Sequence, residues 1–258
     1  MNNSYLNKNL ECLRRNHPSV FSMVKPLKPS KAYQITPSKN GPLTILKIDQ
    51  EGRKKQLYSQ YDPHKEVCQF LEGLKIKDSI NFIILGFGLG YHSIEIVKNV
   101  SKHANICIFE KDPELFALAI REIDLSMIFE HSGVRFFLDI DPLNARNLLK
   151  PEQTNFILNN YCLVGTKAIV KTNQVYYDNL MQELDAYFKE IRMNLKTLTV
   201  QSKLYYKNIF SNLKKLLFSP GIHHLKNSLN DVPAIVCSAG PSLDKNIQFL
   251  KTAKNNFF

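Results

Sequence analysis

Short apolar runs alternate with helix-like segments through the middle of the chain. Phe82–Leu85 and Asn105–Phe109 are almost wholly apolar, and a third run follows at Val134–Leu138. Apolar runs of this length are typical of strands buried on both faces of a parallel sheet. The segments between them, 91–100 and 113–123, have a helical spacing of apolar residues. This alternation predicts an α/β fold with a doubly wound, Rossmann-like domain.

The first sixty residues have a different pattern, because prolines interrupt them repeatedly. We expect an extended, loop-rich arm there, with no long helix beyond the first few residues. Residues 43–49 and 55–59 flank Gly52 and predict a β-hairpin. Pro63 then opens a predicted helix that reaches about Leu71. The interrupting prolines are Pro18, Pro26, Pro29, Pro37 and Pro42.

A long helical stretch follows the α/β segment. Between Thr166 and Ser219 the chain has neither glycine nor proline. Its apolar residues recur every three or four positions, which predicts one long helix or two shorter ones packed against a core. We expect this stretch to connect two α/β domains. The first members of the stripe are Leu180, Leu184, Tyr187, Ile191, Leu195 and Leu198.

Near the end of the chain, the segment Ala234–Asp244 combines an apolar run, which predicts a strand at 234–236, with a glycine-proline turn and a helix start. Gly240 permits backbone angles closed to other residues, and Pro241 suits a first helical turn. Ser242 or Asp244 offers a cap for the unpaired amides. Amides at a helix N-terminus favour an anion, and after a strand the usual anion is a nucleotide phosphate.

A second glycine loop, Gly86-x-Gly88-x-Gly90, follows the first apolar run, and Glu110 lies twenty residues beyond it. This spacing is similar to the cofactor loop of Rossmann-like S-adenosylmethionine methyltransferases, in which an acidic residue holds the ribose. Two interpretations stay open. The loop binds a cofactor, or its glycines only allow a helix to pack closely on a strand.

Composition and charge narrow the classes of function. The net charge is +11 with 44% hydrophobic residues, and we find no nucleic-acid motif, metal-ligand spacing, transmembrane segment or signal peptide. We therefore expect a cytoplasmic protein. Its basic surface is expected to be solvated, with binding of an acidic partner or of a membrane surface as the alternatives. The cysteines are expected to be buried free thiols; they are Cys12, Cys68, Cys107, Cys162 and Cys237.

The order of these features resembles the motility-associated factor family of flagellin glycosyltransferase-like proteins. The central domain of that family is similar to 6-hydroxymethylpterin diphosphokinase. The Gly-Pro-Ser-Leu loop also resembles the donor loop of bacterial sialyltransferases, which often have Asn where this chain has Ala239. The resemblance implies that a CMP-activated nonulosonic sugar binds at Ser238, Ala239, Gly240, Pro241, Ser242, Leu243 and Asp244.

The sequence predicts four parts: an arm and hairpin (1–60), a Rossmann-like domain (61–165), a helical connector (166–228) and the start of a second Rossmann-like domain (229–258). We expect a truncated enzyme that is inactive alone. Its residues 233–258 are expected either to pack loosely on the helical segment or to complete their sheet with another chain through an exposed strand edge. Three alternatives stay open. They are a pterin diphosphokinase-like enzyme using ATP and Mg²⁺, a methyltransferase-like domain using S-adenosylmethionine, and a non-enzymatic scaffold that holds flagellin or another acidic protein.

Overall fold

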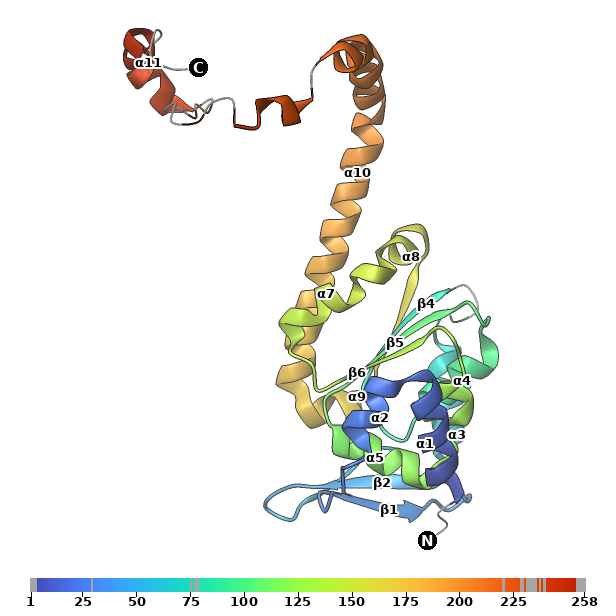
Figure 1. Cartoon of the computed structure of the whole chain (residues 1–258). Coiled ribbons are helices and arrows are strands. Elements are labelled where there is room, and N and C mark those ends of the chain that lie inside the picture. Colours follow the sequence, from blue (N-terminus) through green and yellow to red (C-terminus); the bar gives the residue numbers. More distant parts are fainter. Residues whose placement is uncertain are drawn as a thin grey trace. The chain divides into compact units, whose positions relative to one another are not determined.

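The computed structural model describes residues 4–28, 30–74, 76, 79–219, 221–227, 230, 236, 238 and 240–253 (Figure 1). The chain divides into two compact units, residues 1–198 and 199–258. The long helix α10 (Gln174–Phe218) contributes to both units. Unit 1 contains both sheets.

The centre of unit 1 is a four-stranded parallel sheet in the order β6-β5-β4-β7. Its strands are β4 (Asn81–Leu85), β5 (Asn105–Glu110), β6 (Val134–Leu138) and β7 (Tyr161–Val164). Helices α4 (Tyr91–Asn99) and α5 (Pro113–Glu122) connect the first three strands. The predicted alternation of strands and helices is therefore confirmed, and β7 is an additional strand that the sequence analysis did not identify.

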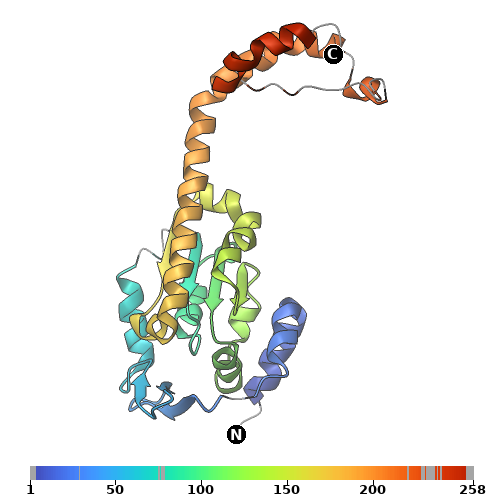
Figure 2. The same cartoon turned by 90° about the vertical axis from the view of Figure 1, so that its left-hand side faces the viewer.

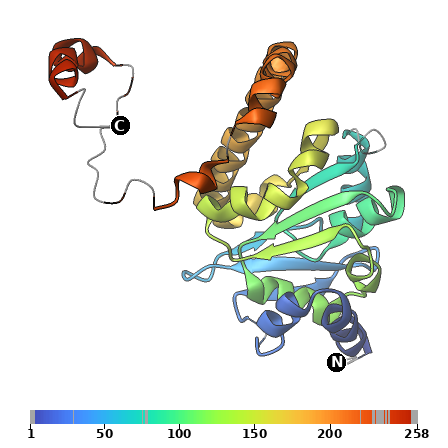
Figure 3. The same ribbon diagram turned by 45° about the horizontal axis from the view of Figure 1, so that its top comes forward.

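Both faces of this sheet are covered, as a Rossmann-like layer requires (Figure 3). Phe82, Ile84 and Ile106 point to one apolar cluster, which includes residues of the N-terminal helices and α5. Ile83 and Cys107 point to the opposite cluster, which includes residues of α7, α8 and α10. The remaining short helices are α3 (Pro63–Glu72), α6 (Ser126–Phe129), η1 (Pro142–Asn144), α7 (Ala145–Leu149), η2 (Lys150–Glu152), α8 (Gln153–Leu158), α9 (Lys167–Val170) and η3 (Lys171–Asn173).

A second, antiparallel sheet forms from β1 (Tyr33–Pro37), β2 (Leu43–Ile48) and β3 (Lys54–Gln56). The hairpin between β2 and β3 confirms the prediction around Gly52, whose φ is +77°. Helix α3 also begins at Pro63 as predicted, and the Asp62 carboxylate caps it by accepting from the amide of Lys65.

The prediction of a loop-rich N-terminal arm is wrong. Helix α1 (Ser4–Asn16) and helix α2 (Pro18–Val24) occupy this segment. The first proline is residue 18, so it cannot interrupt α1, and Pro18 itself is the first residue of α2, where its missing N–H costs nothing. The prolines between 26 and 42 follow both helices and therefore do not interrupt them.

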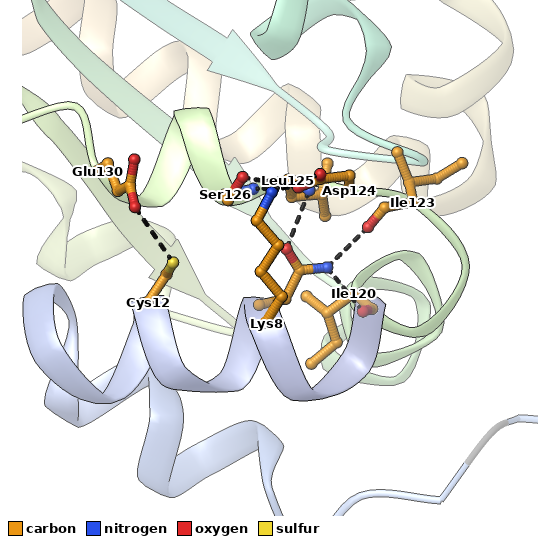
Figure 4. A network of polar contacts seen from close by, with 9 residues as sticks. Lys8, Cys12, Ile120, Ile123, Asp124, Leu125, Ser126 and Glu130 are labelled. Atoms are coloured by element: carbon orange, nitrogen blue, oxygen red, sulfur yellow. Dashed lines mark hydrogen bonds and ion pairs between the residues drawn. The ribbon is translucent and has the colours of Figure 1, made fainter. Parts of the chain in front are cut away.

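Helix α1 is fixed to the core by a network of polar contacts (Figure 4). The fully buried Asn9 amide donates to the carbonyls of Ile120 and Ile123 at the end of α5, at 2.8 and 2.7 Å. Its oxygen accepts from the amide of Leu125 at 3.0 Å. Lys8 pairs with Asp124 at 2.7 Å on the exposed side. Asn9 thus satisfies three backbone groups where α5 turns into α6.

Helix α10 is one continuous helix, and its apolar stripe is buried only in its first part. Tyr177, Leu184 and Ile191 are at most 3% exposed, whereas Leu198 and Ile209 are 59% and 53% exposed. In unit 2, α10 is followed by η4 (Ile222–Leu225) and α11 (Pro241–Ala253) (Figure 2). No described helix is both long and apolar enough to cross a membrane.

The structure describes only some of the residues for which the sequence predicts buried thiols and a strand near the end of the chain. Cys12, Cys107 and Cys162 are buried free thiols, as predicted, and Cys68 is half-buried. Cys237 lies outside the described residues. The predicted strand at 234–236 lies there too, except for Val236, which is 95% exposed.

Candidate functional site

The loop predicted to bind a nucleotide phosphate leads directly into α11. This helix begins at Pro241, the residue at which the sequence predicts a helix start, and Asp244 lies in its first turn. The Gly240 amide donates to the carbonyl of Ser238 at 2.9 Å, and the Leu243 amide donates to the carbonyl of Gly240 at 2.9 Å. Ala239 and the side chain of Ser242 lie outside the described part of the chain.

Two features of this loop suit an anionic group. A Cβ atom at Gly240 would meet no described atom within 4 Å, so the backbone there is open to approach. A thirteen-residue helix also directs its N-terminal amides and the positive end of its dipole towards the loop. The exposed Asp244 carboxylate is the described acidic group of that first turn, where it offers oxygen to a cation.

The other glycine loop lies at the carboxyl end of β4, between that strand and α4. Gly86, Gly88 and Gly90 have φ values of +83°, +58° and +82°, in the left-handed region that favours glycine. Strand β4 lies between β5 and β7, and its carboxyl end is the position at which Rossmann-like sheets bind ligands. The sequence therefore predicted the place and the backbone of this loop correctly.

The amides of this loop are already bound by side chains of the chain itself. One oxygen of Glu110 accepts from the amides of Phe87 at 2.7 Å and Gly88 at 3.3 Å. The Tyr58 hydroxyl accepts from the amide of Leu89 at 3.2 Å. Glu110 is only 1% exposed, so its carboxylate faces the loop amides and not solvent.

The second oxygen of Glu110 is also engaged. It accepts from the amide of Asp112 at 2.8 Å and from the Tyr177 hydroxyl at 3.4 Å. Burial raises the pKa of Glu110, while the three amide hydrogen bonds act in the opposite direction. A carboxylate with this set of donors is well suited to hold a loop together, and it has little capacity left for ribose hydroxyls.

Side chains also fill the space that a cofactor would need beside the glycines. A Cβ on Gly86 would lie 2.3 Å from Cγ2 of Ile169, and one on Gly88 would lie 2.5 Å from the Tyr58 hydroxyl. Ile169 belongs to α9, directly after β7, and is 1% exposed. Close packing of side chains against the loop therefore requires the glycines. This favours the interpretation in which the glycines only allow close packing over the one in which the loop binds a cofactor.

A buried histidine lies beside the same loop. His92, in the first turn of α4, stacks on Tyr58 with ring centroids 5.9 Å apart and meets the ring of Phe70 edge-on. It is 3% exposed, and its Nε2 has no hydrogen-bond partner in the described structure. Burial lowers the pKa of His92 to about 4. The imidazole is therefore neutral at pH 7 and contributes as a packing group.

Sequence reasoning missed the residues that close the loop. Tyr58, Ile169 and Tyr177 come from three separate segments of the chain, and none lies within twenty residues of the glycines. Only contacts between distant segments reveal their role. Within the described residues, no group of three or more His, Cys, Asp or Glu side chains is arranged to hold a metal ion.

Comparison with known proteins indicates the family to which the chain belongs. The chain matches two family models, the glycosyltransferase Maf N-terminal domain over residues 32–199 and the 6-hydroxymethylpterin diphosphokinase MptE-like family over residues 207–258. An uncharacterized protein of Treponema pallidum (strain Nichols) is 33% identical over 84 residues, which are 32% of this chain and 15% of that protein.

A solved structure, that of the Maf glycosyltransferase from Magnetospirillum magneticum AMB-1, is also similar. It matches 100% of this chain with a TM-score of 0.60 and 12% sequence identity, which is evidence of a shared fold. The chain spans 46% of that protein's length. Because the first family model covers most of its residues, the chain belongs to the family of Maf glycosyltransferase N-terminal domains.

Proposed function

We propose that this chain is part of a flagellin glycosyltransferase-like protein, and that its loop 238–244 binds the phosphate of a CMP-activated nonulosonic sugar. The observation that carries the proposal is the position of α11. It begins at Pro241, immediately after Gly240, in a segment that matches the MptE-like family. A glycine turn before a helix N-terminus supplies the amides and the dipole that a nucleotide phosphate requires.

The proposal covers donor binding and not the transfer step. Transfer to a Ser or Thr hydroxyl requires a base for its proton and positive groups for the leaving phosphate. In the described part of the loop, Asp244 is the titratable side chain. A diphosphokinase-like reaction remains the second candidate, because the family matched over residues 207–258 is described by that activity. It would use ATP and Mg²⁺, with Asp244 as a candidate metal ligand.

Calorimetric titration with CMP, ATP plus Mg²⁺, and S-adenosylmethionine tests these assignments. We expect binding of CMP, and an affinity reduced about tenfold or more in Gly240→Val, because the branched side chain blocks approach to the backbone. The matched control is Ser211→Val, an exposed position on α10 in the same unit. Binding of ATP only with Mg²⁺ would replace the donor proposal with the diphosphokinase. Equal CMP affinity in both variants would contradict the loop assignment.

The S-adenosylmethionine titration addresses the methyltransferase alternative. We expect no binding, because Glu110 and Tyr58 already hold the amides of the Gly86–Gly90 loop. Binding that disappears in Gly88→Val would restore this alternative.

A partner-binding role is supported by a different observation. Between Glu190 and Asp231 the sequence has no acidic residue, and the corresponding part of α10 is largely exposed. An exposed helix with lysines beside apolar side chains suits an acidic protein such as flagellin. We expect purified flagellin to bind, and Lys203→Gln, Lys207→Gln and Lys214→Gln together to weaken that binding at low salt. Binding unaffected by these changes would contradict the role.

A further inference from the structure

Three lysines from separate elements lie together at the carboxyl end of the parallel sheet. Lys47 on β2 is directly opposite Lys55 on β3 in the hairpin register. The Lys47 ammonium group donates to the carbonyl of Thr172 at 3.2 Å, next to Lys171 in η3. We call Lys47, Lys55 and Lys171 the lysine cluster.

Two of these lysines share the inner face of the antiparallel sheet. Lys47 pairs with Tyr33 of β1 and alternates with Ile45 along β2. Tyr33 and Ile45 are buried, at 7% and 0% exposure, so this face of the sheet points to the core. Lys47 itself is half-buried. The cluster is therefore positioned by packed strands at the margin of the core.

Repulsion among the three lysines is offset in part by the Thr172 carbonyl and the Tyr33 ring, which both contact the Lys47 ammonium group. Like charges directly opposite on neighbouring strands destabilise a sheet. Among the described residues, no ion pair joins any of the three lysines to Asp or Glu. Partial burial, then the charges of Lys171 and Lys47, lower the pKa of Lys55. An anion placed among these groups would remove their repulsion.

The position in the fold indicates which kind of anion fits. Lys171 follows α9, whose Ile169 fills the space beside Gly86 and Gly88 at the usual ligand position of a Rossmann-like sheet. The lysine cluster thus lies next to the segment that fills this position. The strand register and the hydrogen bond to Thr172 bring cations from β2, β3 and η3 close together, which suits a small, highly charged anion better than an extended acidic peptide.

We propose that the lysine cluster binds a compact oxyanion, a phosphate or pyrophosphate group. The lysine cluster belongs to unit 1 and the donor loop to unit 2, and this proposal does not rest on the proposed function. The phosphate chemistry is shared by inorganic pyrophosphate and by the diphosphate of a nucleotide, and the experiment distinguishes these two sources.

The test is a calorimetric titration of the full chain with inorganic pyrophosphate and with CDP at low and high salt. We expect pyrophosphate binding that weakens with salt and falls about tenfold or more in the triple variant Lys47→Gln, Lys55→Gln, Lys171→Gln. The matched control changes three exposed lysines outside the cluster, Lys28→Gln, Lys102→Gln, Lys150→Gln, and so alters net charge equally. We expect less than a twofold effect from the control.

The possible results of these titrations distinguish the proposal from its alternatives. CDP binding with the same dependence on the lysine cluster supports the proposal and identifies a nucleotide as the source. An equal loss in both triple variants would show a general charge effect and overturn it. Hexaglutamate that binds as tightly as pyrophosphate, with the same lysine dependence, would replace the compact anion with an acidic protein segment. Gly240→Val should leave pyrophosphate binding unchanged if the two sites are separate.

Melting temperatures of the variants show whether they still fold. Replacement of Lys55 by Gln removes repulsion, whereas replacement of Lys47 removes its hydrogen bond to the Thr172 carbonyl, so the triple variant should melt close to the temperature of the unaltered chain when no anion is present. Added pyrophosphate should raise the melting temperature of the unaltered chain and of the control, and leave that of the triple variant unchanged. A triple variant that melts lower and still gains stability from pyrophosphate would contradict the assignment.

Discussion

At the scale of single residues, buried polar side chains decide how the glycine loop of unit 1 is held. Glu110 is a buried carboxylate that accepts three backbone amides, so its charge is compensated by donors that cannot move away. His92 is the opposite case, because its Nε2 has no described partner and its neutral form is favoured by burial. These two groups should respond to pH in different ways, and His92 gives the clearer test.

Stability should fall in acid through His92. Its pKa is about 4 in the folded chain against 6.5 in its ordinary state. The unfolded chain therefore takes up a proton first as pH falls, and folding stability is lost between pH 6.5 and 4. The full loss amounts to about 3 kcal/mol. We expect His92→Phe to flatten this part of the profile of unfolding free energy against pH, measured by urea titration.

His103 provides the control for that prediction. It is exposed in a turn before β5, so His103→Phe makes the same substitution without altering the buried surroundings of His92. His17 also has a lowered pKa from burial, and its contribution cancels when each variant is compared with the unaltered chain. A profile that keeps its full slope in His92→Phe would show that the ring is solvated in the folded state.

At the scale of elements, the hydrophobic pattern predicted the strands and helices well and predicted their contacts poorly. Strands β4, β5 and β6 and helix α11 begin within a residue of their predicted positions, because burial and capping are encoded locally. The spacing placed Glu110 beside the glycine loop, although its partners are the loop amides and not a ribose. The contacts of Tyr58, Ile169 and Tyr177 with the loop were not predictable, since these residues meet it only after the chain folds. The prediction for the N-terminal segment was wrong because prolines restrict only nearby residues, and the prolines from Pro26 onward lie after both α1 and α2.

A double-mutant cycle tests the packing of this loop. Gly88→Ala should destabilise the chain, because φ is +58° and the new Cβ would lie 2.5 Å from the Tyr58 hydroxyl. Strain from φ alone costs about 1–2 kcal/mol. Tyr58→Phe removes that oxygen and leaves the Leu89 amide unpaired, at about 1–3 kcal/mol. We expect the double variant to lose clearly less stability than the sum of the two losses, measured by urea unfolding.

Gly52 separates backbone strain from crowding in this cycle. Its φ is +77°, yet a Cβ there would meet nothing within 4 Å. Gly52→Ala should therefore show the strain alone and no coupling to Tyr58→Phe. Additive losses for Gly88→Ala and Tyr58→Phe would mean that the loop relaxes away from the tyrosine, and the filled crevice would then not explain the need for glycine.

At the scale of the whole molecule, α10 is one helix with two different environments. Its apolar stripe packs on the parallel sheet as far as Ile191 and continues without interruption into residues that are exposed. Local sequence cannot reveal this change, because the spacing of the stripe is the same in both parts. The boundary between the compact units, after Leu198, lies inside the helix and not in a linker.

This arrangement predicts that residues 1–198 fold independently. A chain that ends at Leu198 keeps every buried residue of α10, the last of which is Ile191. Its unfolding free energy in urea should therefore match that of residues 1–258 to within about 0.5 kcal/mol. A chain that ends at Asp185 makes the matched control, since it loses the buried Tyr187, Phe188 and Ile191. Removal of a single large buried side chain costs about 2–5 kcal/mol, so we expect this shorter chain not to fold. If the chain ending at Leu198 were destabilised by several kcal/mol, the exposed part of α10 would have to support the core of unit 1, and the division into two units would be wrong.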